Sequence, residues 1–365
     1  MSETYFVTGA TGFIGRCLTR RLLESGAHVR LLARPASRSK LSWLDRADAE
    51  IVEGDLSDES ALERGVKGVD GVFHLAGLTR ESRAGEFMEV NCGRTLNLAR
   101  VCARQASKPT FVYVSSLSGA GVAPKGDRLS GESGERLYDL RRRKREIDFP
   151  KPVSAYGRSK YAAEANLQSF ANSLPITVVR PPYVFGEWDM ASKQLFVMAK
   201  RRGNFVLPGW KDHYFSFVYV QDLADVLIAA MRRGERLAPD SLELLKGAPH
   251  EKFCSGKGIY FATAPEPILF SEYGRMVGAA FGRKHTRVFH IPPMGVLGAG
   301  VYGEVAKAIS HRAAPMDLNK SLEALHGPWI CAGNKAQEQL GVTISADLES
   351  KFRRVALWYD NQGLL

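Results

Sequence analysis

A glycine-rich turn close to the start of the chain is the feature that most constrains its fold. Residues 4–8 read as a strand, and glycines follow it at positions 9, 12 and 15. Gly9 permits a tight turn, Gly12 lets the backbone approach an anion closely, and Gly15 lets the next helix pack on the strand. This order of strand, glycine turn and helix is typical of a dinucleotide-binding site, in which the helix N-terminus faces a pyrophosphate.

Strands and helices are expected to alternate along the chain after this turn. Further apolar runs typical of strands lie at 28–34, 51–56, 72–77, 110–116 and 176–180. Helical patterns lie at 91–106 and 156–172. This alternation predicts an α/β fold with a Rossmann-type, doubly wound parallel sheet.

The same pattern suggests how the chain divides. We expect residues 1–185 to form the nucleotide-binding domain, with 214–236 returning to it. Residues 186–213 and 237–350 are then expected to build a smaller C-terminal substrate-binding lobe. Residues 351–365 form a closing segment that carries Trp358 and Tyr359.

The end of the second strand bears on the choice of cofactor. An NAD site usually has an acidic residue here to bind the ribose 2′-hydroxyl. This chain has Arg34 instead, with Arg38 and Lys40 close by. Arginine suits a 2′-phosphate, so NADP(H) is preferred over NAD(H), although these cations could also be ordinary surface residues. Asp55 follows the third strand, where a carboxylate could accept a hydrogen bond from the adenine amino group.

Tyr156 and Lys160 are four residues apart and therefore share one face of a predicted helix. Their side chains have reference pKa values of about 10 and about 10.4. A neighbouring cation favours the phenolate, so Lys160 is expected to lower the pKa of Tyr156 and make it a proton carrier. Taken alone, the pair could equally be an exposed aromatic residue beside a solvated lysine.

Motifs along essentially the whole chain resemble the extended short-chain dehydrogenase/reductase family. They are found at residues 8–15, 54–56, 74–77, 90–93, 114–116, 156–160, 180–186, 217–224 and 357–363. The resemblance implies a catalytic group of Ser116, Tyr156 and Lys160, with Ser115 and Ser118 as alternatives to Ser116. Ser116 would bind the substrate oxygen, Tyr156 would transfer the proton, and Lys160 would lower the pKa of Tyr156 and bind the nicotinamide ribose.

The resemblance also implies the set of residues that contact the cofactor. They are Gly9, Thr11, Gly12, Phe13, Ile14, Gly15, Arg34, Arg38, Asp55, Leu56, Leu75, Ala76, Gly77, Ser115, Tyr156, Lys160, Pro181 and Val184.

Departures from the family pattern narrow the expected substrate. Residues 115–121 contain no carboxylate, which argues against sugar-nucleotide dehydratases and decarboxylases. Phe215 stands where epimerases tend to have a diphosphate-binding arginine. The serine-rich stretch is more similar to the dihydroflavonol-reductase and 3β-hydroxysteroid-dehydrogenase branches. They imply an oxidoreductase that interconverts a hydroxyl and a ketone on a bulky, largely apolar molecule. The alternatives are a nucleoside-diphosphate-sugar epimerase and a non-catalytic NADP-sensing regulator.

An apolar substrate pocket is also indicated by aromatic residues near its expected entrance, although most of them could be ordinary core. They are Trp188, Phe196, Phe205, Trp210, Tyr214 and Phe215.

Two segments are unusual. The insertion at 118–153 contains the basic run 141–145, and 137–149 could form a helix. It could be a lid over the substrate or a surface elaboration. Residues 291–311 are apolar and glycine-rich, but Glu304 and Lys307 within them favour a buried amphipathic helix over a membrane-surface helix.

Composition limits the remaining classes. The net charge of +11 comes with no nucleic-acid-binding motif, so we expect no nucleic-acid partner. The five cysteines lack a Cys-x-x-Cys spacing, which argues against a disulfide framework or a metal site. No apolar run reaches the length of a membrane span, and the early strand leaves no room for a signal peptide. A cytoplasmic enzyme that could form a homodimer is therefore expected.

Overall fold

The computed structural model describes residues 2–44, 49–124, 129–130, 136–137, 142–243 and 254–365. A parallel seven-stranded sheet forms the centre of the larger part of the molecule, in the order β13-β8-β5-β4-β1-β2-β3. Its strands are β1 (Thr4–Thr8), β2 (His28–Ala33), β3 (Ala49–Glu53), β4 (Gly71–His74), β5 (Thr110–Val114), β8 (Ile176–Arg180) and β13 (Ile259–Phe261). The predicted Rossmann-type fold is confirmed.

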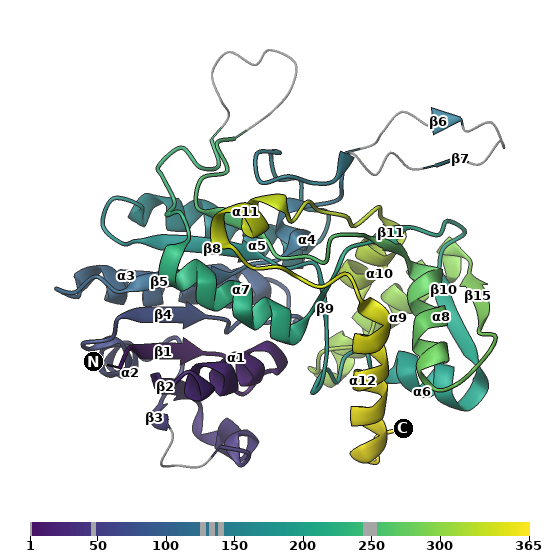
Figure 1. The fold of residues 1–365 in the computed structure, drawn as a ribbon, viewed down its shortest axis with the longest axis horizontal. Helices are drawn as coiled ribbons and strands as arrows, with labels where there is room; N and C mark the ends of the chain where they lie inside the picture. Colours follow the sequence, from purple (N-terminus) through teal and green to yellow (C-terminus); the bar gives the residue numbers. More distant parts are fainter. Residues whose placement is uncertain (1, 45–48, 125–128, 131–135, 138–141, 244–253) are drawn as a thin grey trace.

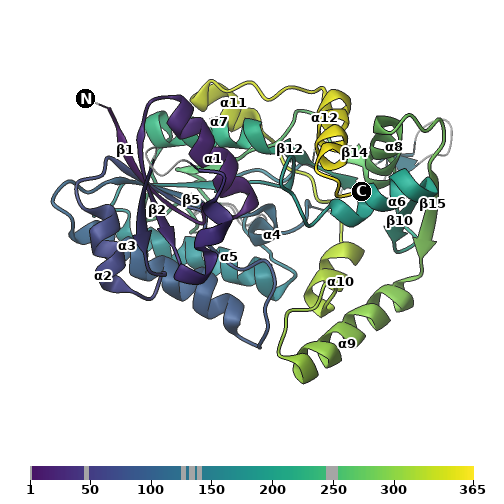
Figure 2. The same cartoon turned by 90° about the horizontal axis from the view of Figure 1, so that it is seen from below.

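Helices cover both faces of this sheet (Figures 1 and 2). One face packs against α1 (Phe13–Glu24), α7 (Val220–Arg233) and α11 (Asn334–Leu340). The other packs against α2 (Glu59–Val66), α3 (Thr95–Arg104) and α5 (Ala155–Leu167). Both faces are therefore dry, and the strands need the continuous apolar runs that the sequence displays.

Shorter elements join these helices to the strands. They are the 3₁₀ helices η1 (Pro35–Leu41) and η4 (Gln168–Phe170), the π-helix η2 (Met88–Arg94), and the short helix α4 (Leu117–Ala120). The predicted helix at 91–106 thus divides into η2 and α3, and the helix at 156–172 into α5 and η4.

A second, smaller layer of structure lies beside the ends of the sheet strands (Figure 2). Its helices are α6 (Lys193–Arg202), α8 (Phe270–Ala280), α9 (Pro293–Ser310), α10 (Leu318–Leu325) and α12 (Leu348–Asn361). Strand β10 (Asn204–Pro208) pairs with β15 (Arg287–Ile291), β11 (Tyr214–Phe215) with β14 (Ile268–Leu269), and β12 (Phe217–Tyr219) with β9 (Tyr183–Phe185). Strand β13 lies in the range expected for the substrate lobe, yet it pairs with β8 and extends the central sheet.

A buried ion pair joins helix α5 to the sheet. Arg180, the last residue of β8, donates from Nε to both oxygens of Glu164 at 3.0 and 3.1 Å and from Nη2 at 2.5 Å. Both side chains are 0% exposed. Because Glu164 lies one turn after Lys160, this pair fixes the part of the helix on which the expected catalytic residues stand.

The insertion between α4 and α5 differs from the prediction. The two-residue strands β6 (Leu129–Ser130) and β7 (Arg136–Leu137) pair with each other. Residues 142–149 form no α-helix, so the prediction of a helix over 137–149 is wrong for them, and residues 138–141 lie outside the described part. Arg143 instead pairs with Glu266, and the Lys144 ammonium donates to the carbonyl of Phe149. These tertiary contacts outweigh the helix propensity of the segment.

The prediction of a buried helix at 291–311 is also wrong in part. Helix α9 forms there and packs against α10, with Lys307 buried and paired with Glu304 and Glu81. Its opposite face is apolar and exposed, with Met294, Tyr302 and Ile309 at 78%, 76% and 77% exposure. The sequence pattern is amphipathic, but the charged side chains face the protein.

The Arg180–Glu164 pair leads to a stability prediction. Replacing Glu164 with glutamine leaves a buried guanidinium without its counter-charge, which costs about 3–5 kcal/mol for buried pairs. We expect a loss of that size in the free energy of unfolding, measured by urea denaturation. Glu59→Gln, which removes the exposed partner of Arg104, is the control and should change it by less than about 1 kcal/mol. A loss for Glu164→Gln no larger than the control would contradict this account.

Candidate active site

The glycine turn has the geometry expected for a phosphate-binding loop. Gly9 has a φ of +81°, and a Cβ there would lie 2.7 Å from the backbone nitrogen of Ala76. A Cβ on Gly15 would lie 2.2 Å from the carbonyl oxygen of Gly9. Helix α1 begins after Gly12 with no side-chain cap on its first turn. Its N–H groups therefore remain available to an anion, and the loop fits a dinucleotide pyrophosphate.

A buried hydrogen-bond network supports this loop from beneath. His74 Nδ1 lies 2.7 Å from Thr8 Oγ1, and its Nε2 lies 2.8 Å from Thr95 Oγ1. Thr95 donates its hydroxyl to the carbonyl of Asn91, so it must accept from the imidazole, which is then protonated on Nε2. Burial, with a smaller contribution from Lys160, lowers the pKa of His74 to about 3. This neutral histidine ties the ends of β1 and β4 together, a role that the sequence did not reveal.

The residues expected at the adenosine ribose are not equally available. Arg38 pairs with Glu53 at the end of β3. Arg34 is exposed and, among the described residues, has no ion-pair partner. Asp55 accepts hydrogen bonds from the backbone and hydroxyl of Ser57, and Arg94 lies 3.9 Å from its carboxylate. Of Arg34 and Arg38, Arg34 is therefore the one whose charge no carboxylate engages within the described residues.

Tyr156 and Lys160 lie on α5 and face the ends of the sheet strands. The Lys160 ammonium donates to the carbonyl of Val114, at the end of β5, at 2.8 Å. It also lies 4.8 Å from the centroid of the Tyr113 ring. Ser116 follows β5 and caps α4 by accepting from the backbone N–H of Ser118 at 3.1 Å. The Ser116 side chain also acts on Tyr156, whose pKa it lowers. The structure thus brings all three predicted catalytic residues together.

The protonation of these groups differs from the expectation. Burial raises the pKa of Tyr156 and the carboxylate of Glu323 raises it further, although the hydrogen bond with Ser116 lowers it. Lys160 was expected to lower this pKa, and for the structure as described that prediction is wrong. Burial lowers the pKa of Lys160 itself to about 8, partly offset by Glu164. Tyr156 is therefore a neutral phenol near pH 7, suited to donating a proton.

Asn91 fixes the loop that crosses above the catalytic helix. Its side-chain oxygen accepts from the backbone N–H of Leu78 at 2.7 Å, and its nitrogen donates to the carbonyl of Leu78 and to Ser159 Oγ, both at 3.0 Å. A Cβ on Gly77 would meet this amide at 2.9 Å and the Lys160 ammonium at 3.7 Å. Because Gly77 has no side chain, the space beside the Lys160 ammonium stays free for a ligand.

Two cavities adjoin each other beside Ser116 and Tyr156, and both are lined by Tyr183 and Glu323. The larger, of about 880 Å³, has Phe13, Gly77, Tyr156 and Val184 in its wall, four of the residues predicted to contact the cofactor. The smaller, of about 320 Å³, is mainly apolar. Its lining consists of Ser116, Leu117, Ser118, Pro182, Tyr183, Pro208, Phe215, Phe270, Glu323, Ala324 and Trp329.

The other predicted cofactor residues are distributed around the larger cavity and the glycine turn. Pro181 accepts a hydrogen bond from the backbone N–H of Leu117, and the backbone N–H of Ala76 donates to Thr8. Ser115 is buried, and its hydroxyl has no hydrogen-bond partner within the described protein. Leu56 is buried in the core, whereas Leu75 and Ile14 pack partly buried against it. Thr11 lies in the turn itself.

The predicted aromatic residues separate into distinct roles. Phe215 lines the apolar cavity and packs on Phe270 with ring centroids 4.9 Å apart. Phe196 and Phe205 are fully buried core, as the plainer interpretation had it. Trp210 is 65% exposed, and Trp188 packs against Trp358 outside this cavity.

Glu323 is the residue at the site that sequence reasoning missed. It stands on α10 of the smaller lobe and lines both cavities. Its Oε1 accepts a hydrogen bond from Ser154 Oγ, and the Ser118 side chain lowers its pKa. Ser154 caps α5, two residues before Tyr156. No sequence motif identifies Glu323 as a site residue. It reaches the site only because α10 packs against the start of α5, which is distant in the sequence.

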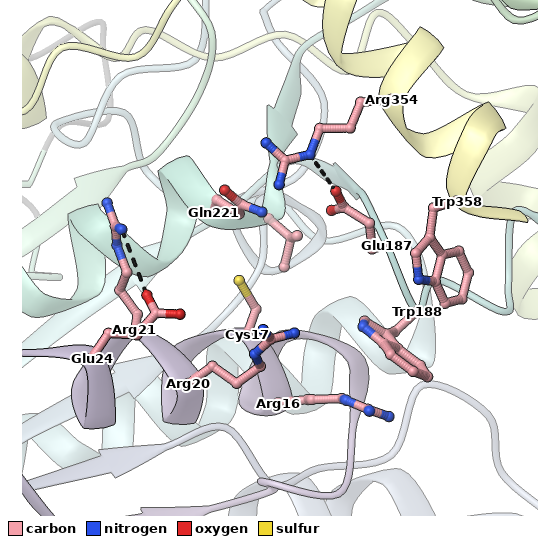
Figure 3. Close-up of a pocket in the computed structure, with 11 residues that line it drawn as sticks. Arg16, Cys17, Arg20, Arg21, Glu24, Glu187, Trp188, Gln221, Arg354 and Trp358 are labelled. Carbon is pink, nitrogen blue, oxygen red and sulfur yellow. Dashed lines mark hydrogen bonds and ion pairs between the residues drawn. The ribbon is translucent and has the colours of Figure 1, made fainter. Parts of the chain in front are cut away.

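A further hollow, of about 330 Å³, lies between α1, the start of α7 and α12 (Figure 3). Arg16 points toward Trp188, with its guanidinium carbon 3.1 Å from the ring centroid, and Arg354 pairs with Glu187. None of Ser116, Tyr156 and Lys160 lines it. It is therefore separate from the reaction site.

Two kinds of feature are absent from the described residues, a metal-binding cluster and a membrane-spanning helix. No group of three histidine, cysteine or acidic side chains there could hold a metal ion. None of the helices in that part of the chain combines the length and the apolar character that a membrane-spanning segment needs.

Comparison with known proteins places this geometry among relatives. Residues 5–243 match the model of the NAD dependent epimerase/dehydratase family. The ceramide reductase of Caulobacter vibrioides is 27% identical over 98% of this chain and 95% of its own length. A protein of Synechocystis sp., named provisionally as a dihydroflavonol 4-reductase, is 28% identical over 90% of this chain and 95% of its own. The 3 beta-hydroxysteroid dehydrogenase/Delta 5-->4-isomerase of Mycobacterium tuberculosis is 28% identical over 76% and 69%.

Solved structures agree on the fold. The UDP-glucose 4-epimerase of Thermotoga maritima superimposes with a TM-score of 0.70 over 98% of this chain and 99% of its own, at 19% identity. At that identity the likeness shows the fold alone. The match of the family model over more than half of the chain goes further, and shows that this chain belongs to the NAD dependent epimerase/dehydratase family.

Proposed function

We propose that this chain is an NADP(H)-dependent oxidoreductase that interconverts a hydroxyl and a ketone on a bulky, largely apolar molecule. The observation that carries the proposal is the lining of the smaller cavity, which Ser116 borders. Among its residues, Ser116, Ser118, Tyr183 and Glu323 have polar side chains, and no arginine or lysine lines it. A diphosphate would enter that space without a cation to pair with, which is costly, whereas a hydrocarbon body would replace water there favourably.

The roles of the catalytic group follow from its hydrogen bonds. A carbonyl oxygen held where the two cavities adjoin could accept from Ser116, which lines the smaller one, and from Tyr156, which lines the larger one. The raised pKa of Tyr156 keeps its proton in place until the oxygen gains negative charge. Lys160 stands one turn after Tyr156 on α5, and its positive charge would favour that negative charge. The nicotinamide cofactor, when bound, supplies or accepts the hydride.

The preference for NADP(H) rests on Arg34. Arg34 is exposed at the end of β2 without an ion-pair partner among the described residues, whereas Arg38 is engaged by Glu53. An arginine can bind a 2′-phosphate through two parallel hydrogen bonds, which an acidic residue at this position could not do.

The names of several relatives support an apolar substrate, because they mention lipid molecules. A ceramide, a sterol and a hydroxysteroid are named for proteins 25–29% identical to this chain. These molecules share a large hydrocarbon body with a reacting hydroxyl or ketone. We extend that shared chemistry to this chain, without choosing among the three.

The test is NADPH oxidation with a panel of apolar ketones, comprising steroid 3-ketones, 2-decalone and long-chain 3-ketones. Tyr156→Phe should lower kcat for an accepted ketone by about 10²–10⁴, the usual contribution of a proton-transferring side chain, with the Kd for NADPH unchanged. Tyr161→Phe on the same helix is the control and should keep normal turnover. Full activity in Tyr156→Phe, or conversion of nucleoside-diphosphate sugars in place of ketones, would refute the proposal.

Cofactor choice can be tested by binding alone. Arg34→Ala should weaken NADPH binding by about 1.5–3 kcal/mol, the contribution of hydrogen bonds to a charged group, which is roughly 10- to 150-fold in Kd. NADH binding should stay within about threefold, because NADH lacks the 2′-phosphate. Arg38→Ala is the matched control. Equal losses for NADPH and NADH would count against a phosphate-binding role for Arg34.

The pKa of Lys160 predicts a pH dependence. Because burial lowers this pKa to about 8, Lys160 carries its charge below that pH and loses it above. We expect kcat/KM for ketone reduction to fall as the pH rises through about 8. In Lys160→Arg, whose guanidinium keeps its proton, the fall should move to higher pH even if the activity is lower overall. Profiles of the same shape in both proteins would exclude Lys160 as the titrating group.

A further inference from the structure

Glu323 brings a carboxylate into the substrate cavity from the smaller lobe. It lies on α10 and, like Tyr183, lines both the larger cleft next to Tyr156 and the smaller apolar cavity next to Ser116. Its charge is felt at Tyr156, whose pKa it raises. The carboxylate is therefore close to the point where the reacting oxygen is expected.

Glu323 has hydrogen-bond donors but no counter-ion. Ser154 Oγ donates to its Oε1 at 2.5 Å, and the Ser118 side chain lies in the same cavity wall. No cation lies in ion-pair contact with it within the described part of the chain, although Lys320 stands one turn earlier on α10. Burial raises the pKa of Glu323, with Ser154, Ser118 and Lys320 opposing the rise. Glu323 is partly buried, so leaving its carboxylate without a cation is costly, and a positively charged ligand would remove that cost.

The rest of the cavity favours a cation of a particular kind. Four aromatic residues line it together with Glu323, namely Tyr183, Phe215, Phe270 and Trp329. Glu323 is the only acidic residue in this lining, and no lysine, arginine or histidine belongs to it. Aromatic faces attract ammonium groups, and a carboxylate beside them adds an opposite charge for the same group to pair with. Trp329 does not donate a hydrogen bond to the Glu323 carboxylate, because its indole N–H donates to the backbone carbonyl of Glu323.

We propose that Glu323 is a recognition residue for a substrate ammonium group, so that the natural substrate is an apolar amino alcohol or amino ketone. This inference rests on the proposed hydroxyl/ketone chemistry and names its substrate class. The amine would lie close to the reacting carbon, between the Glu323 carboxylate and the aromatic side chains. Ser116 and Tyr156 would hold the substrate oxygen on the other side.

A purely structural role for Glu323 makes a different prediction. Ser154 accepts from the backbone N–H of Gly157 at 2.9 Å, and Asn319 accepts from that of Ala155 at 2.7 Å. Helix α10 therefore holds the N-terminus of α5, and Glu323 takes part through Ser154. If that were its whole function, replacing it would change stability without changing which ligands bind.

An acidic substrate is the competing possibility within the same site. Arg80 and Lys320 line the larger cleft, and burial, followed by the charge of Arg80, lowers the pKa of Lys320. Neither residue lines the apolar cavity. Preference for a carboxylate probe over an amine probe would assign recognition to these two cations.

The test compares three probes of equal length, n-octylamine, octan-1-ol and octanoate, binding to the full chain at pH 7 by calorimetry. We expect octylammonium to bind at least tenfold more tightly than octanol and octanoate to bind most weakly. In Glu323→Gln the tenfold preference should fall to about twofold or less. Glu272→Gln, on the exposed start of α8 and paired with Arg275, is the matched control and should keep it.

Two further variants separate recognition from stability. Ser154→Ala removes the helix cap but keeps the carboxylate, so it should lower Tm and preserve the amine preference. If Glu323→Gln does not fold, Glu323→Asp can be used in its place. It keeps the carboxylate and should retain part of the preference for the amine. Equal binding of amine and alcohol by the wild type, tighter binding of octanoate, or an unchanged preference in Glu323→Gln would each overturn the proposal. If the protein reduces ketones but does not prefer the amine probe, only this inference is refuted. If it prefers the amine probe but reduces no ketone, the proposed function is refuted.

Discussion

The ion pair between Arg180 and Glu164 holds the catalytic helix against the sheet, and the geometry of the site depends on it. Glu164 and Lys160 lie one turn apart on α5, while Arg180 ends β8. Both charges are removed from water, so each needs the other to remain in the core. The pair thereby fixes the distance between α5 and the strand ends, and with it the 2.8 Å contact between the Lys160 ammonium and the carbonyl of Val114.

Other polar contacts refine this arrangement at both ends of α5. Asn91 bridges the loop at Leu78 to Ser159, and Ser154 joins the helix N-terminus to Glu323 on α10. The first contact ties the helix to the loop after β4, and the second ties it to α10. Tyr156 lies between them, so its environment is set jointly by both lobes. Its raised pKa follows from that enclosure.

The sequence predicted the parts of the site that depend on local geometry. Gly9 has a positive φ, and Gly15 lies against the backbone of the turn. Tyr156 and Lys160 share a face because a helix has a fixed period. The pKa of Tyr156 was predicted in the wrong direction because burial, which dominates it, is a property of the packed lobes. Glu323 was missed for the same reason, since the absence of a carboxylate at 115–121 says nothing about one arriving from α10. The pattern of α9 likewise gave its helical period, but not which face would meet the protein.

The central claim is that Ser116, Tyr156 and Lys160 act together in hydride transfer to a carbonyl held in an apolar cavity. Its most direct test uses NADPH with deuterium at the transferable position of the nicotinamide, an accepted apolar ketone, and mass spectrometry of the product. The account predicts one deuterium per alcohol molecule, bonded to the former carbonyl carbon. Product alcohol without deuterium would contradict it, as would consumption of a nucleoside-diphosphate sugar with no ketone reduced.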